Sequence, residues 1–434
     1  MFNFLIYTNP GSYYRLVHKM PHAVLSFPTE LPTNNPYSNL KAWNIDAAYR
    51  ALQEGVITDG TKNELQNEVI TSTKDNYIFI RRYFGKMQVL NVLILRLITL
   101  HNPILEIWTY LSTRRIQRVQ LEPKISYDWE SFDSTLVRDQ PLVSVIIPTL
   151  NRYEYLKDVL KDLEAQEYKN FEVIICDQSE PYEPYFYKGW NLTLTVIQQN
   201  EKALWLARNK CVAASKGEYI LLFDDDSRVA KDWISQHLRC VDFFKTTISA
   251  GVTNTLVGGG LSKKESYFHS SDVFDTGNAL VHRSVFEKAG LFDRQFEKQR
   301  MGDSEFGLRA LLNGFKIISN PFASRIHLKV ETGGLRQMGS WDAWRPKSLL
   351  APRPIPSVLY LFRRYHGNAE AILFVMKNIP LTYLPYKFKR NRKLKAVFML
   401  LFPFFLPLAI ISVSKSWQLA SVKLKEGDKI TSLV

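Results

Sequence analysis

The sequence predicts an α/β protein with a mostly parallel sheet flanked by helices, and two observations support this prediction. Between residues 143 and 227, apolar segments of strand length alternate with segments of helical periodicity, an order typical of βαβ units. Two of the predicted strands end in acids, Asp177 and Asp224–Asp226. Because parallel sheets bind ligands at the carboxyl ends of their strands, we expect these acids to lie along one edge of the sheet.

The elements of this sheet follow one another along the chain. The apolar segment 143–152 predicts a buried strand and a proline-containing turn. Within residues 153–166, four apolar residues share one helix face, Leu156, Val159, Leu160 and Leu163. The other predicted elements are strands at 171–179, 192–200 and 218–227, and a helix at 203–217.

Composition indicates a globular chain of two or three domains with an anionic partner. The chain has 434 residues and a net charge of +14, which suggests nucleic acid, anionic lipid or a phosphorylated substrate as that partner. Its cysteines, Cys176, Cys211 and Cys240, are far apart and form no Cys-x-x-Cys pair. This spacing argues against a disulfide framework and a zinc knuckle, and it fits a reducing compartment.

Residues 1–140 are expected to form an N-terminal accessory region of unknown role, followed by a linker. The Pro- and Asn-rich stretch 27–39 predicts a loop. The apolar segment 89–100 contains Arg96 and is too short to span a bilayer, so we expect a buried or interfacial helix. The polar, aperiodic segment 122–141 predicts the linker.

The three consecutive acids at 224–226 allow two interpretations. Like charges at a strand end repel one another, and a divalent cation would stabilise them because hard cations prefer carboxylate oxygen. Alternatively, the acids form a solvated turn that caps the helix beginning near Lys231. The acid that ends another strand, Asp177, favours a ligand site.

Residues 143–330 resemble the family 2 glycosyltransferases, which have the nucleotide-diphospho-sugar transferase fold called GT-A. Six segments carry the resemblance: PTLNR (148–152), ICDQS (175–179), LARN (206–209), FDDDS (223–227), TGNALVHRSVFEKAGLFD (276–293) and GDSEFGLRALLNGFKI (302–317). It implies a Rossmann-like GT-A domain over residues 141–345. A helical C-terminal region would follow at 346–434.

The resemblance implies a binding site for a nucleotide-diphospho-sugar, UDP- or dTDP-linked. Asp177 matches the acid that accepts a hydrogen bond from the base, with a turn aspartate bonded to its own backbone as the alternative. Asp224 matches the acid that faces the ribose. Asp225 is the spacer after it and is also expected at the donor site. The other residues implied in donor binding are Pro148, Thr149, Arg152, Arg208 and Arg336.

By the same resemblance, Asp226 would bind Mn²⁺ or Mg²⁺, which neutralises the charge that grows on the departing nucleoside diphosphate. His327 is a candidate further metal ligand, although a lone histidine is more often structural. The glycine-containing segment 329–341 is predicted to be a lid over the donor, with Arg336 gripping a phosphate. An ordinary surface loop is the alternative.

Asp303 matches the general base of an inverting glycosyl transfer, which takes the proton from the acceptor hydroxyl. The Glu that precedes this Asp in the family is Gly302 here. Asp303 is also a plausible cap for a helix at 304–313. The residues expected at the acceptor are Gly277, Asn278 and Glu305.

The C-terminal region joins a basic run to an apolar one. Residues 386–395 hold six basic side chains, and residues 396–413 hold no charge. Eighteen helical residues span about 27 Å, just short of a bilayer core. The pattern predicts a re-entrant or interfacial anchor on an anionic membrane leaflet, with a buried helical hairpin as the alternative. Nucleic acid is the rival partner for the basic run, and it is not expected here.

The leading hypothesis is therefore a metal-dependent, inverting glycosyltransferase of polysaccharide biosynthesis. Its acceptor would be a saccharide or a lipid-linked saccharide at the cytoplasmic face of the cell membrane, where the protein would be peripheral or monotopic. The alternative is a non-catalytic sugar-nucleotide-binding or scaffold subunit of a polysaccharide assembly complex. Two features are compatible with this alternative: Gly302 stands where the family has a Glu, and no role is assigned to residues 1–140.

Overall fold

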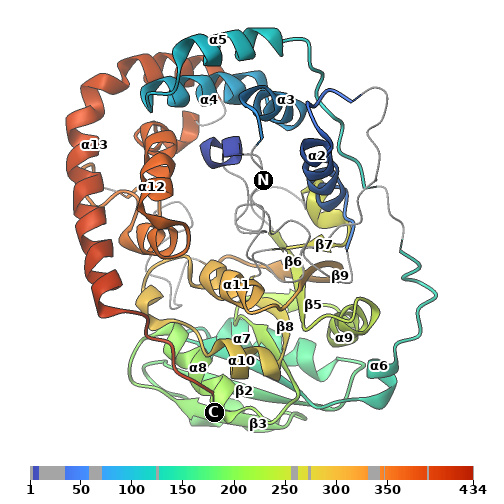
Figure 1. Cartoon of the computed structure of the whole chain (residues 1–434). Coiled ribbons are helices and arrows are strands. Elements are labelled where there is room, and N and C mark those ends of the chain that lie inside the picture. The colour runs from blue at the N-terminus through green and yellow to red at the C-terminus, as the bar shows by residue number, and fades with distance from the viewer. Residues whose placement is uncertain are drawn as a thin grey trace. The chain divides into compact units, whose positions relative to one another are not determined.

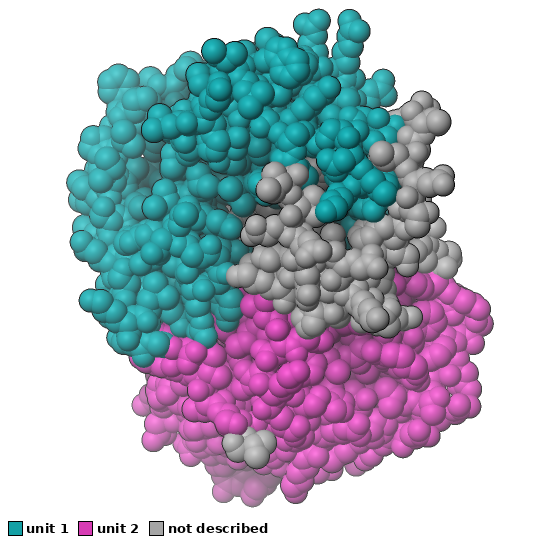
Figure 2. Space-filling view, in the orientation of Figure 1, with its two compact units in different colours: residues 1–54, 60–122, 338–427 teal, residues 55–59, 123–337, 428–434 magenta. Residues whose placement is uncertain are grey.

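The chain divides into two compact units, each assembled from separate stretches of sequence (Figures 1 and 2). Unit 1 comprises residues 1–54, 60–122 and 338–427, and unit 2 comprises residues 55–59, 123–337 and 428–434. The computed structural model describes residues 3–8, 35–57, 71–123, 127–255, 262–271, 275–330, 343–346, 348–388 and 391–433. The division differs from the three consecutive regions that we expected, because residues from both sides of segment 123–337 share unit 1, and residues 428–434 belong to unit 2.

Unit 2 is built on a mixed sheet. Its described residues form nine strands in the order β3-β2-β1-β4-β8-β6-β9-β5, with β7 beside β9. Strands β3, β2, β1 and β4 are mutually parallel, and β8 runs antiparallel to β4. The strands are β1 Val143–Thr149, β2 Phe171–Asp177, β3 Leu194–Gln198, β4 Tyr219–Phe223, β5 Ser227–Val229, β6 Ile248–Thr255, β7 His269–Ser270, β8 Asn278–His282 and β9 Ile317–His327.

Helices flank this sheet, so the predicted α/β fold is confirmed. The apolar face predicted between residues 153 and 166 is buried in the core of unit 2. The helices of the unit are α6 Thr135–Asp139, α7 Tyr153–Glu164, η4 Pro184–Tyr187, α8 Leu204–Ala214, α9 Trp233–Phe243, η5 Lys263–Ser266, α10 Arg283–Ala289, η6 Arg294–Phe296 and α11 Gly302–Leu312.

The central strands bring the predicted site residues to one edge of the sheet. Every residue of β1 and β4 is buried, as expected for parallel strands covered on both faces. In the β1–β2 register Thr149 pairs with Asp177, and in the β1–β4 register Ile146 pairs with Leu222. The acids that follow β2 and β4 therefore emerge at the same carboxyl-terminal edge.

A buried polar cluster ties α9 to β6 and β8. The side-chain oxygen of Asn278 accepts a hydrogen bond from Trp233 Nε1 (2.8 Å) and lies 3.1 Å from His237 Nε2. The Asn278 amide donates to the carbonyls of Val252 and Ala323, at 2.9 Å each. Asn278, which we expected at the acceptor, thus uses its side chain inside the core.

The same cluster predicts that stability falls with acid. Burial lowers the pKa of His237 from 6.5 to about 4. The unfolded chain therefore binds this proton more readily, and the stabilisation, about 3 kcal/mol at most, is lost as pH falls from about 6.5 towards 4. We expect urea titrations of His237→Gln to show a shallower pH dependence of the unfolding free energy in this window. An unchanged slope would contradict the assignment.

Unit 1 is helical and joins the N-terminal residues of the chain to residues 338–427. Lys377 donates hydrogen bonds to the carbonyl of Ile6 (2.8 Å) and to that of Thr8, and Leu373 and Met376 pack against the same core as Phe4. Its elements are η1 Asn3–Tyr7, α2 Leu40–Gln53, α3 Thr73–Tyr83, α4 Lys86–Ile98, α5 Pro103–Ser112, α12 Pro356–Thr382, η7 Tyr386–Phe388 and α13 Arg392–Glu426.

The last helix is longer than the apolar run suggested. Helix α13 has 35 residues and contains Pro403 and Pro407. Among the described residues it is the helix with the length and apolar composition needed to cross a membrane. Beyond Gly427, the chain belongs to unit 2 again, where the Leu291 amide donates to the Thr431 carbonyl (2.9 Å).

Candidate active site

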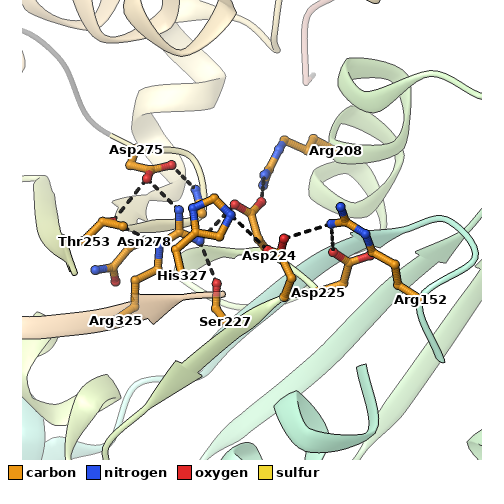
Figure 3. A network of polar contacts seen from close by, with 12 residues as sticks. Arg152, Arg208, Asp224, Asp225, Ser227, Thr253, Asp275, Asn278, Arg325 and His327 are labelled. Carbon is orange, nitrogen blue, oxygen red and sulfur yellow. Dashed lines mark hydrogen bonds and ion pairs between the residues drawn. The ribbon is translucent and has the colours of Figure 1, made fainter. Parts of the chain in front are cut away.

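The acids that follow β4 form ion pairs with three arginines (Figure 3). Asp224 accepts hydrogen bonds from Arg208 Nη2 (2.6 Å) on one carboxylate oxygen and from Arg325 Nη1 (2.9 Å) on the other. Arg208 and Arg325 are fully buried, and the Asp224 side chain is mostly buried. Charge-assisted hydrogen bonds are strong where water is excluded. Two arginines therefore fix the orientation of Asp224.

Asp225 points back towards the loop after β1. One of its oxygens accepts a hydrogen bond from Thr149 Oγ1 (2.8 Å), and the other accepts one from Arg152 Nη1 (3.0 Å). Burial raises the pKa of Asp225 to about 6, against the lowering effect of Arg152. Asp225 therefore joins β4 to the Thr149–Arg152 turn.

Asp226 faces the end of β9. His327 Nε2 lies 3.2 Å from one Asp226 oxygen, and Arg152 Nη1 donates to the other (3.0 Å). The candidate ligand atoms of Asp224, Asp226 and His327 all lie within 4.8 Å of one another. Two carboxylates and an imidazole are donors that suit Mn²⁺ or Mg²⁺, so the residues present fit a divalent cation.

Arg325 organises this edge of the sheet, and sequence reasoning missed it. Besides Asp224, it donates to Ser227 Oγ (2.8 Å), to Thr253 Oγ1 (3.0 Å) and to Asp275 (2.6 Å). The two carboxylates raise its pKa against the effect of burial. A usable signal was present: Arg325 and His327 are two residues apart, so they lie on the same face of a strand.

Gly277 allows the backbone to approach this ion pair. A Cβ atom at residue 277 would lie 2.1 Å from Asp224 Oδ2 and 2.1 Å from Arg325 Nη1. Gly277, which we expected at the acceptor, thus lies against the acid cluster.

Gly277→Ala is therefore expected to displace the Asp224–Arg325 pair. Overpacking of this kind destabilises proteins by about 1–3 kcal/mol, and we expect sugar transfer to fall with it. Thermal unfolding and product formation would be measured together. Gly85→Ala is the control, since its nearest atom would lie at 3.6 Å; equal behaviour of the two variants would contradict the prediction.

Asp303 lies in the first turn of α11, close to α8. The helix begins at Gly302, after Met301 in a left-handed conformation (φ 83°), so Asp303 is not the cap that we considered. Its carboxylate accepts a hydrogen bond from the Ser304 amide (2.8 Å). A Cβ atom on Gly302 would lie 2.2 Å from the Trp205 ring. The indole of Trp205 therefore occupies the space that a larger side chain at residue 302 would need. Trp205 precedes Arg208 by one turn of α8.

Comparisons with known proteins match this half of the chain. The family model described as glycosyl transferase family 2 matches residues 144–290. Residues 144–290 of the chain therefore resemble this family. A Bacillus subtilis relative named putative glycosyltransferase EpsH is 31% identical over 105 residues, 23% of this chain and 30% of the relative.

Two further proteins resemble this chain over longer stretches. The putative teichuronic acid biosynthesis glycosyltransferase TuaG of Bacillus subtilis is 28% identical over 210 residues, 43% of this chain and 82% of the relative. The solved structure of the mannosyltransferase PcManGT from Pyrobaculum calidifontis is 17% identical, with a TM-score of 0.45. That alignment covers 69% of this chain and 92% of PcManGT.

Asp177 is hydrogen-bonded by two tyrosines. Its carboxylate accepts hydrogen bonds from the hydroxyls of Tyr153 and Tyr187 (2.7 Å each) and from the Ser179 amide (2.8 Å). Burial and the hydrogen bond to Asp177 raise the pKa of Tyr153 to about 12. A base that bonds to Asp177 would therefore share the carboxylate with these donors. Pro148, another residue expected at the donor, pairs with Cys176 in the register of β1 and β2.

Glu305 of the transferase faces inwards. It is fully buried and forms an ion pair with Arg309 (2.9 Å). Arg309 in turn donates to the carbonyls of Ala289, Gly290 (3.1 Å) and Leu291 (2.9 Å). This arrangement supports the loop after α10 and gives Glu305 a structural partner. Arg336 and most of the expected lid lie outside the described residues.

Proposed function

We propose that the protein is an inverting, metal-dependent glycosyltransferase that uses a nucleotide-diphospho-sugar, UDP- or dTDP-linked. The observation that carries this proposal is the Asp224–Asp226–His327 cluster at the carboxyl edge of the sheet. Its carboxylates point to where β4 and β9 end, the location at which an open α/β sheet binds ligands.

On the donor side, Asp226 and His327 would hold Mn²⁺ or Mg²⁺. When bound, the cation neutralises the negative charge on the leaving nucleoside diphosphate. Asp224 has both oxygens engaged by arginines, which supports a role facing the ribose. Arg152 bridges Asp225 and Asp226 and would contribute positive charge to the donor site.

On the acceptor side, Asp303 would act as the general base. The acceptor hydroxyl oxygen forms a bond to the anomeric carbon, the bond from that carbon to the diphosphate breaks, and the hydroxyl proton passes to Asp303. The hydrogen bond from the Ser304 amide (2.8 Å) would hold the Asp303 carboxylate in place as it accepts the proton.

The acceptor is proposed to be a saccharide or lipid-linked saccharide at the cytoplasmic face of a membrane. The name of the relative TuaG, a teichuronic acid biosynthesis enzyme, supports a role in polysaccharide biosynthesis. The apolar helix α13 supports peripheral or monotopic attachment, as does the basic run 386–395 around its start, which includes the exposed Lys387 and Lys393.

A donor screen tests this proposal. Release of UDP, dTDP and GDP from nucleotide-sugars would be followed with Mn²⁺, with Mg²⁺ and with a chelator. We expect cation-dependent release with a UDP- or dTDP-sugar, lost on chelation and in Asp226→Asn. Release that is unaffected by the chelator would contradict the metal site. Donor binding without turnover by any donor would instead favour a non-catalytic subunit.

A further inference from the structure

In the α4–α5 hairpin of unit 1, helix α5 has polar side chains inside and apolar side chains outside. The buried residues of α5 are Glu106 and Thr109. Glu106 accepts hydrogen bonds from Arg96 Nε (2.7 Å) and from the Tyr77 hydroxyl (2.8 Å). A surface helix in water has the opposite pattern, because apolar side chains are stabilised by leaving water. The inversion indicates that the outer face of α5 meets something other than water.

The outward side chains are large. Leu100, in the connection between the two helices, is 92% exposed, Ile104 is 80% exposed and Trp108 is 59% exposed. The other exposed large apolar residues of the hairpin are Met87, Ile94, Ile98, Leu105, Ile107 and Leu111. Contiguous exposed apolar surface of this kind marks an interaction site. Figure 1 shows α5 at the periphery of unit 1, over α4.

The conformation of Leu100 supports this interpretation. Its φ is 62°, in the left-handed region that residues with a Cβ atom adopt at a cost and glycine adopts readily. Because the side chain is 92% exposed, packing within the described residues does not offset that cost. The strained backbone holds a leucine outward at the tip of the hairpin.

The chemistry beside the apolar face favours an anionic bilayer as its partner. Arg114, Arg115 and Arg118, close to the end of α5, are exposed and would meet lipid phosphates. Trp108 is of the residue type that concentrates at membrane interfaces. The ten residues of α5 span about 15 Å, too little to cross a bilayer and enough to lie within its interface.

We propose that the α4–α5 hairpin is a second membrane-attachment element, which inserts Leu100, Ile104 and Trp108 among anionic lipids. It is separate in sequence from α13 and does not depend on which sugar is transferred. Two weak attachments on one unit bind a surface far more firmly than either does alone.

An environment-sensitive fluorophore on the full-length protein tests the insertion directly. It would be attached through Leu100→Cys; Cys176, Cys211 and Cys240 are buried. With vesicles of phosphatidylglycerol and phosphatidylcholine we expect a blue shift and brighter emission. Lys157→Cys, exposed on α7, is the matched control and should show neither.

The outcomes separate the two attachments. Vesicle cosedimentation without a spectral change at residue 100 would overturn insertion of the hairpin and leave α13 as the anchor. Absence of cosedimentation would contradict both. A spectral change that depends on protein concentration without vesicles would assign the face to a second copy of the chain and overturn the proposal.

Leu100→Gly distinguishes binding from folding. Glycine relieves the positive φ, so the unfolding temperature should stay the same or rise. Vesicle affinity should nevertheless fall, and in combination with Ile104→Gln by about tenfold or more. A stable double variant with unchanged affinity would overturn the proposal.

Discussion

Asp303→Asn is expected to lower the turnover of sugar transfer by about 10²–10⁴-fold, the usual contribution of a positioned general base. The amide has the size of the carboxylate but cannot take the acceptor proton. Affinity for the nucleotide donor should stay within about twofold, because the proposed donor contacts lie at the ends of β1, β4 and β9. Steady-state kinetics and nucleotide titrations would give the two quantities.

Glu154→Gln is the matched control for this variant. Glu154 is an exposed acid in the first turn of α7, in the same unit, so its removal repeats the loss of helix-dipole stabilisation without touching the site. Turnover should be unchanged in it. If Asp303→Asn transferred sugar at the wild-type rate, Asp303 would have no part in the mechanism.

Arg325→Met is expected to destabilise the protein by about 3–5 kcal/mol, because it removes a buried cation that two acids share. Asp224 and Asp275 each lose an ion pair with Arg325 (2.9 and 2.6 Å). Asp224 also loses one of the two bonds that orient it, so sugar transfer should fall even at temperatures where the variant is folded. Denaturant unfolding and turnover at a permissive temperature would be measured.

Arg228→Met is the control for a neighbouring strand. Arg228 is 42% exposed and pairs with Asp162 (2.7 Å), and such exposed pairs contribute about 0–1 kcal/mol. A loss below about 1 kcal/mol in Arg325→Met, equal to that of the control, would show that Arg325 is not the organising cation.

The fold of unit 2 followed from local patterns. The apolar runs of β1 and β4, and the helical spacing of Leu156 to Leu163, gave the alternation that the structure contains. Unit 1 could not be predicted in this way. Its core joins Phe4 to Leu373, and no local pattern indicates a contact between residues so distant in sequence.

The site was predictable where chemistry is concentrated in one segment. Three adjacent acids and the strand-end Asp177 pointed to one edge of the sheet. Arg325 was missed because a single arginine inside a strand resembles a surface residue until its partners are known. Glu305 and Asn278 show the converse: the sequence placed them at the acceptor, whereas their side chains bond to Arg309 and Trp233 in the interior.

The central claim is that the acids after β4, together with His327, form the cation site of a nucleotide-sugar transferase. The most direct test is the anomalous density of manganese in crystals soaked with Mn²⁺ and the nucleoside diphosphate of the best donor. We expect one strong peak between Asp226 and His327, lost in Asp226→Asn. A peak elsewhere in unit 2, or nucleotide bound at that edge without manganese, would contradict the account.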